Sequence, residues 1–167
     1  SHEMPMKIQI APSSPSPEIR LIVTADDLGI GEERDDGIFE AHRAGIVQAA
    51  SLLVNGDNAV QAAKKALECG LTLGLHLNLS EGPAVSDSSN VKSLLTWQRA
   101  HWCGPPASNG GALEFRGRYE FIDALTKGQV SLEEVATEVA AQLERFHALL
   151  GYTPTHLDGH QHTHVLP

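Results

Sequence analysis

Residues 19–29 read IRLIVTADDLG, a short β-branched run followed by two acids, a leucine and a glycine. The run is typical of a strand buried in a parallel sheet, and the acids predict that this strand ends at Ala25. The next segment, residues 34–44, has apolar residues at a helical spacing, and Gly45 is a good helix terminator. A buried strand followed by a helix is the repeating unit of parallel α/β proteins.

The same order recurs along the chain. Strands are predicted over residues 46–54 and 71–79 and from His156 onward, and helices over residues 57–67, 120–127 and 131–150. Ser131 and Glu134 form a capping box at the start of the last helix. The buried stripe expected on that helix is Leu132, Val135, Val139, Leu143, Phe146 and Leu150. This alternation predicts an α/β fold with a parallel, β/α barrel-like sheet, of which four strands make about the first half.

Two segments lack an apolar period. Residues 1–18 carry four prolines and predict a flexible N-terminal tail, which leaves residues 19–167 as a single β/α domain. Residues 80–119 are rich in Ser, Gly, Pro and Asn. They predict one long loop, and a loop of this length is usually functional or poorly ordered.

Composition limits the kinds of partner. The 167 residues have a formal net charge of −9, which repels polyphosphate and anionic lipid, so neither nucleic acid nor a membrane is expected as a partner. No apolar run is long enough to span a bilayer. Cys69 and Cys103 are too few for a disulfide scaffold, and they favour a reducing, cytoplasmic location.

The last predicted strand is rich in histidine. Asp158, His160, His162 and His164 all occupy even positions, so in an extended chain their side chains point to one side. Burying these groups without partners costs about 1–3 kcal/mol each. A divalent metal ion offsets that cost, because neutral imidazole and carboxylate groups are its ligands.

Two further polar groups are expected at the same edge of the sheet. Asp26 and Asp27 follow the first strand, and His76 and Asn78 lie on one face late in the third. Taken singly, the acid pair is typical of a helix cap or a solvated turn, and His76 of a core histidine. The histidine strand on its own favours a metal or catalytic site, with a solvated tail as the alternative. Because carboxyl ends of parallel strands meet at one edge, their conjunction favours a hydrolytic metal site with the second acid as general base. Dinucleotide, NTP and serine-hydrolase motifs are absent from the sequence.

Four stretches in this order resemble the YdjC-like carbohydrate deacetylases: VTADDLG (residues 23–29), SLLVNG (51–56), GLHLNL (74–79) and PTHLDGHQHTH (154–164). The resemblance implies a barrel-like fold, a Mg²⁺ or, as the second choice, a Zn²⁺ site, and removal of N-acetyl groups from amino sugars such as chitooligosaccharides. It implies Asp27, His76 and His160 as metal ligands and Asp26 as the catalytic base. The residues expected beside the ligands or facing the substrate are Asn78, Asp158, His162 and His164.

Members of that family are longer, and their C-terminal part completes the barrel and supplies a further histidine motif near the leaving group. The resemblance therefore implies metal binding more directly than turnover. Two interpretations follow. One is an active deacetylase whose half-barrel forms a homodimer. The other is a truncated, catalytically weak, metal-binding isoform that acts as an interaction module.

Overall fold

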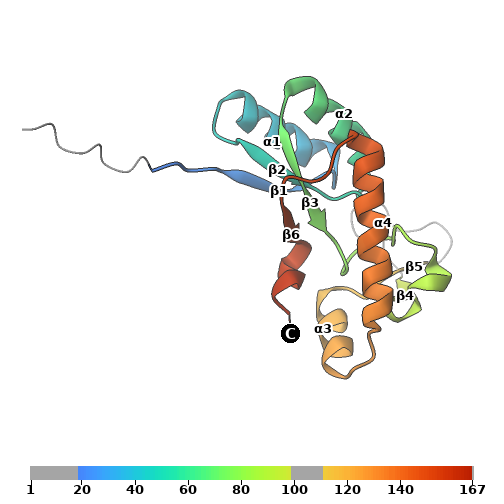
Figure 1. Cartoon of the computed structure of the whole chain (residues 1–167). Coiled ribbons are helices and arrows are strands. Elements are labelled where there is room, and N and C mark those ends of the chain that lie inside the picture. The colour runs from blue at the N-terminus through green and yellow to red at the C-terminus, as the bar shows by residue number, and fades with distance from the viewer. Residues whose placement is uncertain (1–18, 99–110, 167) are drawn as a thin grey trace, which may run out of the picture.

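A computed structural model describes residues 19–98 and 111–166. Its centre is a four-stranded parallel sheet in the order β1 (Thr24–Leu28), β2 (Ala49–Leu52), β3 (Thr72–Leu77) and β6 (Leu157–Gly159), shown in Figure 1. The sheet curls as one half of a barrel, so the predicted parallel α/β half-barrel is confirmed.

Three helices pack beside the sheet: α1 (Glu32–Arg43), α2 (Ala59–Cys69) and α4 (Leu132–Leu150). The helix α2 contacts both α1 and α4, so the three form one layer. Gly70 and Gly151 end α2 and α4 with left-handed backbone, at φ 73° and 78°, as the sequence predicts. The core between helices and sheet includes Leu28, Leu52, Leu73, Leu75, Phe39, Ala62, Ala66 and Phe146.

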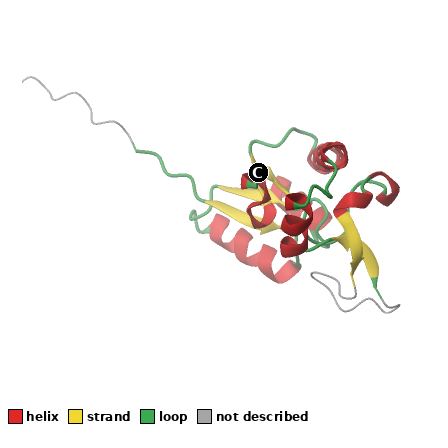
Figure 2. Ribbon diagram, turned by 90° about the horizontal axis from the view of Figure 1, so that it is seen from below, coloured by secondary structure: helices red, strands yellow, loops and turns green. Residues whose placement is uncertain are grey.

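A second, smaller core lies under what we call the hairpin lobe. This lobe consists of the antiparallel strands β4 (Leu95–Gln98) and β5 (Ala112–Phe115) and the helix α3 (Arg118–Thr126). Short 3₁₀ helices, η1 (Ser88–Asn90) and η2 (Lys92–Leu94), lead into it. Figure 2 shows the hairpin standing apart from the main sheet. The prediction of one long loop over residues 80–119 is therefore wrong, because strands of four residues are too short to give a clear alternation.

The structure differs from the sequence-based predictions in three places. The first strand runs over Thr24–Leu28 rather than over residues 19–25, so both acids lie within it. Ile19 is 94% exposed. The histidine segment is extended only to Gly159, and η3 (His160–Val165) is a 3₁₀ helix in which Gln161 and His162 have left-handed backbone. Its even-numbered residues therefore do not share one strand face.

The third correction concerns α4. Ser131 caps this helix as predicted, accepting a hydrogen bond from the backbone N–H of Glu134. Leu132, however, is exposed, and the polar Glu138 and Gln142 are fully buried. Loop backbone groups on the facing segment hold these two side chains, which hydropathy alone does not reveal.

The predicted tail, residues 1–18, lies outside the described residues. Within residues 19–98 and 111–166, no helix combines the length and apolarity that crossing a bilayer requires.

Candidate metal centre

A β-bulge at the end of β1 places the two acids. The β1–β2 register runs from Thr24 and Ala25 opposite Ala49 and Ala50 to Leu28 opposite Leu52, so β1 carries one extra residue. Asp27 has left-handed backbone with φ 58°, a conformation that is unfavourable for a residue other than glycine. Asp26 is exposed while Asp27 is half-buried, and both line a cavity of about 260 Å³.

Three side chains from three strand ends converge in this cavity. The Oδ1 atom of Asp27 lies 2.8 Å from Nδ1 of His160 and 3.2 Å from Nε2 of His76. The two imidazole nitrogens are themselves 3.3 Å apart. The structure thus brings Asp27, His76 and His160 together, with one potential ligand atom from each.

The two oxygens of Asp27 have different surroundings. Oδ2 accepts a hydrogen bond of 2.6 Å from Arg34 of α1. Oδ1 is buried and accepts no hydrogen bond of acceptable geometry, although both imidazoles lie at ion-pair distance. The nearby imidazoles of His160 and His76 hold the pKa of Asp27 well below its usual range, despite partial burial. The carboxylate is therefore ionised, with one oxygen that lacks a hydrogen bond.

Each histidine uses its other ring nitrogen to bind a carboxylate. Nδ1 of His76 lies 2.5 Å from Oδ1 of Asp158 and 3.3 Å from Oγ of Ser51. Nε2 of His160 lies 2.9 Å from Oε2 of Glu81. Histidine ligands of metals usually have such an outer carboxylate, because it fixes the ring and its tautomer.

These carboxylates also dominate the protonation of the rings. Burial by itself lowers the pKa of His76, but the neighbouring carboxylates of Asp158 and Asp27 outweigh burial and raise the pKa to about 9. Burial opposes protonation of His160 as well, and Asp27 and Glu81 together raise its pKa above the usual value. The carboxylates therefore shift both rings toward their charged forms.

The other predicted residues have varied positions. Asp158, His162 and His164 line the cavity, as does Arg118 from the hairpin lobe. Nδ1 of His164 accepts a 3.0 Å hydrogen bond from the backbone N–H of Gly159, so this ring holds the turn itself. Asn78 is fully buried and does not line the cavity.

Sequence reasoning missed three contacts of the site: Glu81, Arg34 and Ser51. Glu81 had a usable signal, because it follows the third strand at the carboxyl edge where the other acids gather. Arg34 and Ser51 carry no comparable pattern, since their roles arise from the packing of α1 and β2 beside the site.

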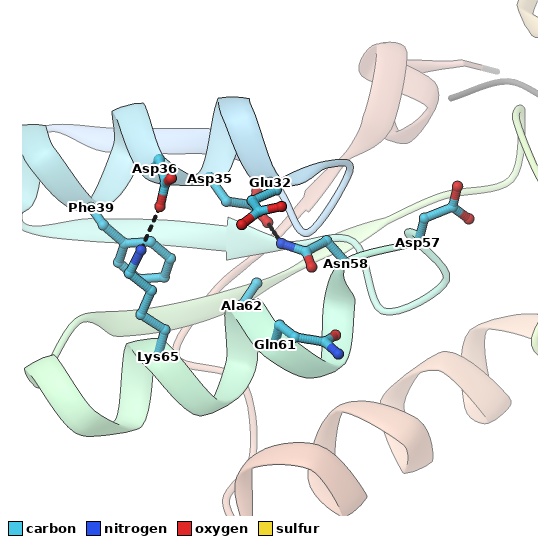
Figure 3. Close-up of a pocket in the computed structure, with 9 residues that line it drawn as sticks. All are labelled: Glu32, Asp35, Asp36, Phe39, Asp57, Asn58, Gln61, Ala62 and Lys65. Atoms are coloured by element: carbon cyan, nitrogen blue, oxygen red, sulfur yellow. Dashed lines mark hydrogen bonds and ion pairs between the residues drawn. The ribbon is translucent and has the colours of Figure 1, made fainter. Parts of the chain in front are cut away.

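A neighbouring cavity of about 350 Å³ lies between α1 and α2 (Figure 3). Asp35 accepts hydrogen bonds of 2.7 Å from the backbone N–H of Gly29 and from Nδ2 of Asn58. Lys65 pairs with Asp36 at 2.5 Å on its outer side. Asp35 therefore fastens the loop after β1 to the start of α2, directly behind the bulge that carries Asp27. Its burial raises the pKa of Asp35.

A parallel β/α half-barrel with an Asp–His–His group at its strand ends describes a class of proteins rather than one particular protein. Within that class, the chain belongs to the family described as YdjC-like protein, whose profile matches residues 20–167.

Similar proteins carry deacetylase names. The carbohydrate deacetylase of Mus musculus is 47% identical over 90% of this chain and 44% of its own length. The chitooligosaccharide deacetylase of Klebsiella pneumoniae (strain 342) is 36% identical over 87% of this chain and 50% of its own length. A solved structure from Enterococcus faecalis V583, named for cellobiose-phosphate cleavage, gives a TM-score of 0.66 at 28% identity, covering 86% of this chain and 49% of that one. The chain thus spans about half the length of the curated relatives it matches.

Proposed function

We propose that this chain belongs to a metal-dependent hydrolase that removes N-acetyl groups from amino-sugar carbohydrates of the chitooligosaccharide type. The observation that carries the proposal is Oδ1 of Asp27, a buried carboxylate oxygen without a hydrogen bond that faces two imidazole nitrogens. The deacetylase names of the relatives supply the reaction.

The donor set fits a divalent cation. Neighbouring ligands around an ion with bonds of about 2.1 Å lie about 3 Å apart, and the three donor atoms here are separated by 2.8–3.3 Å. Asp27, His76 and His160 would hold the ion. The family resemblance favours Mg²⁺, whereas two imidazoles are more typical of Zn²⁺, so both ions enter the test.

Hydrolysis joins the oxygen of a water to the acetyl carbonyl carbon and breaks the C–N bond, which gives acetate and a free amine. A divalent ion held at this site supplies Lewis acidity and lowers the pKa of water. Asp26 is at the cavity wall, exposed and without a role in binding the ion, and it takes the proton of the attacking water. Asp158 and Glu81 keep the two rings oriented.

The test is release of acetate from chitin oligosaccharides with added Mg²⁺, with added Zn²⁺ and with a chelator. We expect release that depends on the ion and is lost in Asp26→Asn, while calorimetry shows that this variant still binds the ion. Ion binding without acetate release from the unaltered chain would favour the metal-binding interaction module instead. Loss of ion binding in Asp26→Asn would show that the roles of the two acids are reversed.

We also propose that the 167-residue chain associates as a homodimer. Within the described residues, β1 and β6 each have a single neighbour in the main sheet, and unpaired strand edges favour pairing with another chain. The segment before β1 adds exposed Ile19, Leu21 and Ile22 beside one edge. Light scattering is expected to give about twice 17.9 kDa, with a melting temperature that falls on dilution. A monomer with a concentration-independent melting temperature would contradict this.

A cytoplasmic location stays a prediction from the cysteine content.

A further inference from the structure

The side chain of Glu81 decides which nitrogen of His160 faces the other donors. An ionised carboxylate only accepts hydrogen bonds, so the 2.9 Å contact requires the proton on Nε2 of His160. When the ring is neutral, Nδ1 then keeps its lone pair, and this is the atom 2.8 Å from Asp27 and 3.3 Å from His76.

The other histidine of the site has the opposite arrangement. Asp158 binds Nδ1 of His76, which leaves Nε2 to face Asp27. The two rings therefore approach the same point through different nitrogens. In each case the outer carboxylate binds one ring nitrogen, and the other ring nitrogen faces the remaining donor atoms of the site.

The backbone of Glu81 is held on both sides by one buried side chain. Oδ1 of Asn78 accepts hydrogen bonds of 3.0 Å from the N–H groups of Ser80 and Glu81, and Nδ2 of Asn78 donates at 2.7 Å to the carbonyl oxygen of Glu81. Asn55 of the preceding loop adds a 2.9 Å hydrogen bond to the carbonyl oxygen of Pro83. This turn is thus fixed by amide side chains whose partners are nearly all backbone atoms.

Buried polar side chains of α4 bind the backbone of this turn. Oε1 and Nε2 of Gln142 bind the backbone N–H and carbonyl oxygen of Asn78 at 3.1 Å and 2.6 Å. Glu138 accepts hydrogen bonds of 2.9 Å from the N–H groups of Val85 and Ser86 and one of 2.7 Å from Gln142. Burying such groups is costly unless they are hydrogen-bonded, and here all but the bond between Gln142 and Glu138 lead to backbone atoms of the segment that carries Glu81.

We infer that Glu81 is a positioning residue, which presents Nδ1 of His160 to the ion, and that Asn78, Gln142 and Glu138 are its support. The inference rests on the proposed metal site and adds to it a residue that acts through a ligand. Asn78 accordingly acts through the turn it holds rather than by meeting the substrate.

The experiment measures Zn²⁺ and Mg²⁺ binding by calorimetry in Glu81→Ala, Glu81→Gln and the control Asp87→Ala. It also records the ¹⁵N shifts of the His160 ring in the metal-free protein at a pH where the ring is neutral. Losing an outer hydrogen-bond partner weakens metal binding by about 10–100-fold, and we expect this for Glu81→Ala together with a mixed tautomer. Glu81→Gln keeps an acceptor oxygen and is expected to recover most of the affinity. Asp87 lies in the same segment, its side chain accepts hydrogen bonds from Ser89, and loss of that side chain is expected to change neither readout.

Equal weakening by Glu81→Gln and Glu81→Ala would overturn the inference, because loss of charge alone would then explain the effect. Unchanged affinity and an unchanged tautomer in Glu81→Ala would overturn it as well. If the unaltered protein binds neither ion, the proposed function fails, and the tautomer of His160 still decides whether Glu81 positions the ring. The side chain of Glu81 is 33% exposed, so these variants are expected to fold.

Discussion

Two aspartates, Asp27 and Asp35, flank the same loop after β1 but have opposite surroundings. Asp35 is 2% exposed, and its two oxygens accept hydrogen bonds of 2.7 Å, one from Gly29 and one from Asn58. Asp27 is less buried, yet one of its oxygens has no hydrogen bond. Burial raises the pKa of Asp35, whereas neighbouring imidazoles lower the pKa of Asp27. Of these two carboxylates, Asp27 keeps an oxygen without a hydrogen bond, and it is therefore the one that fits the proposed ion.

The largest expected effect separates these two carboxylates by metal binding. Asp27→Asn is expected to weaken ion binding by more than about 100-fold, since it removes a charged ligand, and His160→Ala is expected to abolish stoichiometric binding. Asp35→Asn is expected to bind as the unaltered protein does. Calorimetric titration with Zn²⁺ and Mg²⁺ measures all three, and retained binding in either of the first two variants would remove the site from this interpretation.

The second prediction concerns pH. His76 has a pKa of about 9 in the metal-free protein, so at pH 7 its ring carries a proton that the ion must displace. Apparent affinity is therefore expected to rise about tenfold per pH unit for each proton released, and to level off above about pH 9. Titrations in two buffers of different ionisation enthalpy count the protons. Asp35→Asn should leave this slope unchanged, and a flat profile between pH 6 and 8 would contradict the assignment of His76.

The third prediction concerns folding stability, for which we expect the buried Asp35 to be important. Asp35→Ala leaves two N–H donors without their acceptor, which is expected to lower the free energy of unfolding by about 1–3 kcal/mol. Urea denaturation of the metal-free protein measures this loss. Asp36→Ala is the matched control, because its exposed pair with Lys65 is expected to contribute less than about 1 kcal/mol. Equal losses in the two variants would mean that the bonds of Asp35 do not stabilise the loop.

The smallest effect is expected at Arg34, which binds the outer oxygen of Asp27 and is itself half exposed. Arg34→Gln removes a charge but can still donate a hydrogen bond. Ion binding is expected to weaken by only about 2–5-fold, in keeping with an exposed ion pair worth less than about 1 kcal/mol. A loss as large as that of Asp27→Asn would instead make Arg34 the main determinant of the carboxylate's orientation.

Much of the site could be predicted from sequence, because chemistry and topology agree there. Parallel strands bring their carboxyl ends together, so Asp27, His76 and His160 were expected at one place, and the structure puts them there. Whether they hold an ion stays a prediction. The bulge that turns Asp27 inward was not predictable, since a register shift depends on pairing with β2 and leaves no periodic signal.

Errors in the predicted fold have a common cause. Periodicity reports only whether a side chain is apolar, so Leu132 was expected in the buried stripe of α4 and Glu138 was not part of it. Leu132 is exposed, whereas Glu138 is buried and accepts a hydrogen bond from a distant loop. The segment after Gly159 was expected to be extended, and two left-handed residues, Gln161 and His162, fold it into a turn instead. Neither the hydrogen bonds of Glu138 nor the left-handed residues leave a periodic signal in the sequence.

The 19-residue helix α4 also connects the two hydrophobic cores of the molecule. At about 1.5 Å per residue it is nearly 30 Å long, and Phe146 and Leu150 lie in the core under the sheet while Val135 and Val139 pack against the core of the hairpin lobe. Because both cores pack against this one helix, we expect them to lose their packing together. The hairpin lobe and the half-barrel should therefore unfold as one cooperative unit, with backbone amides on both sides exchanging with solvent at comparable rates.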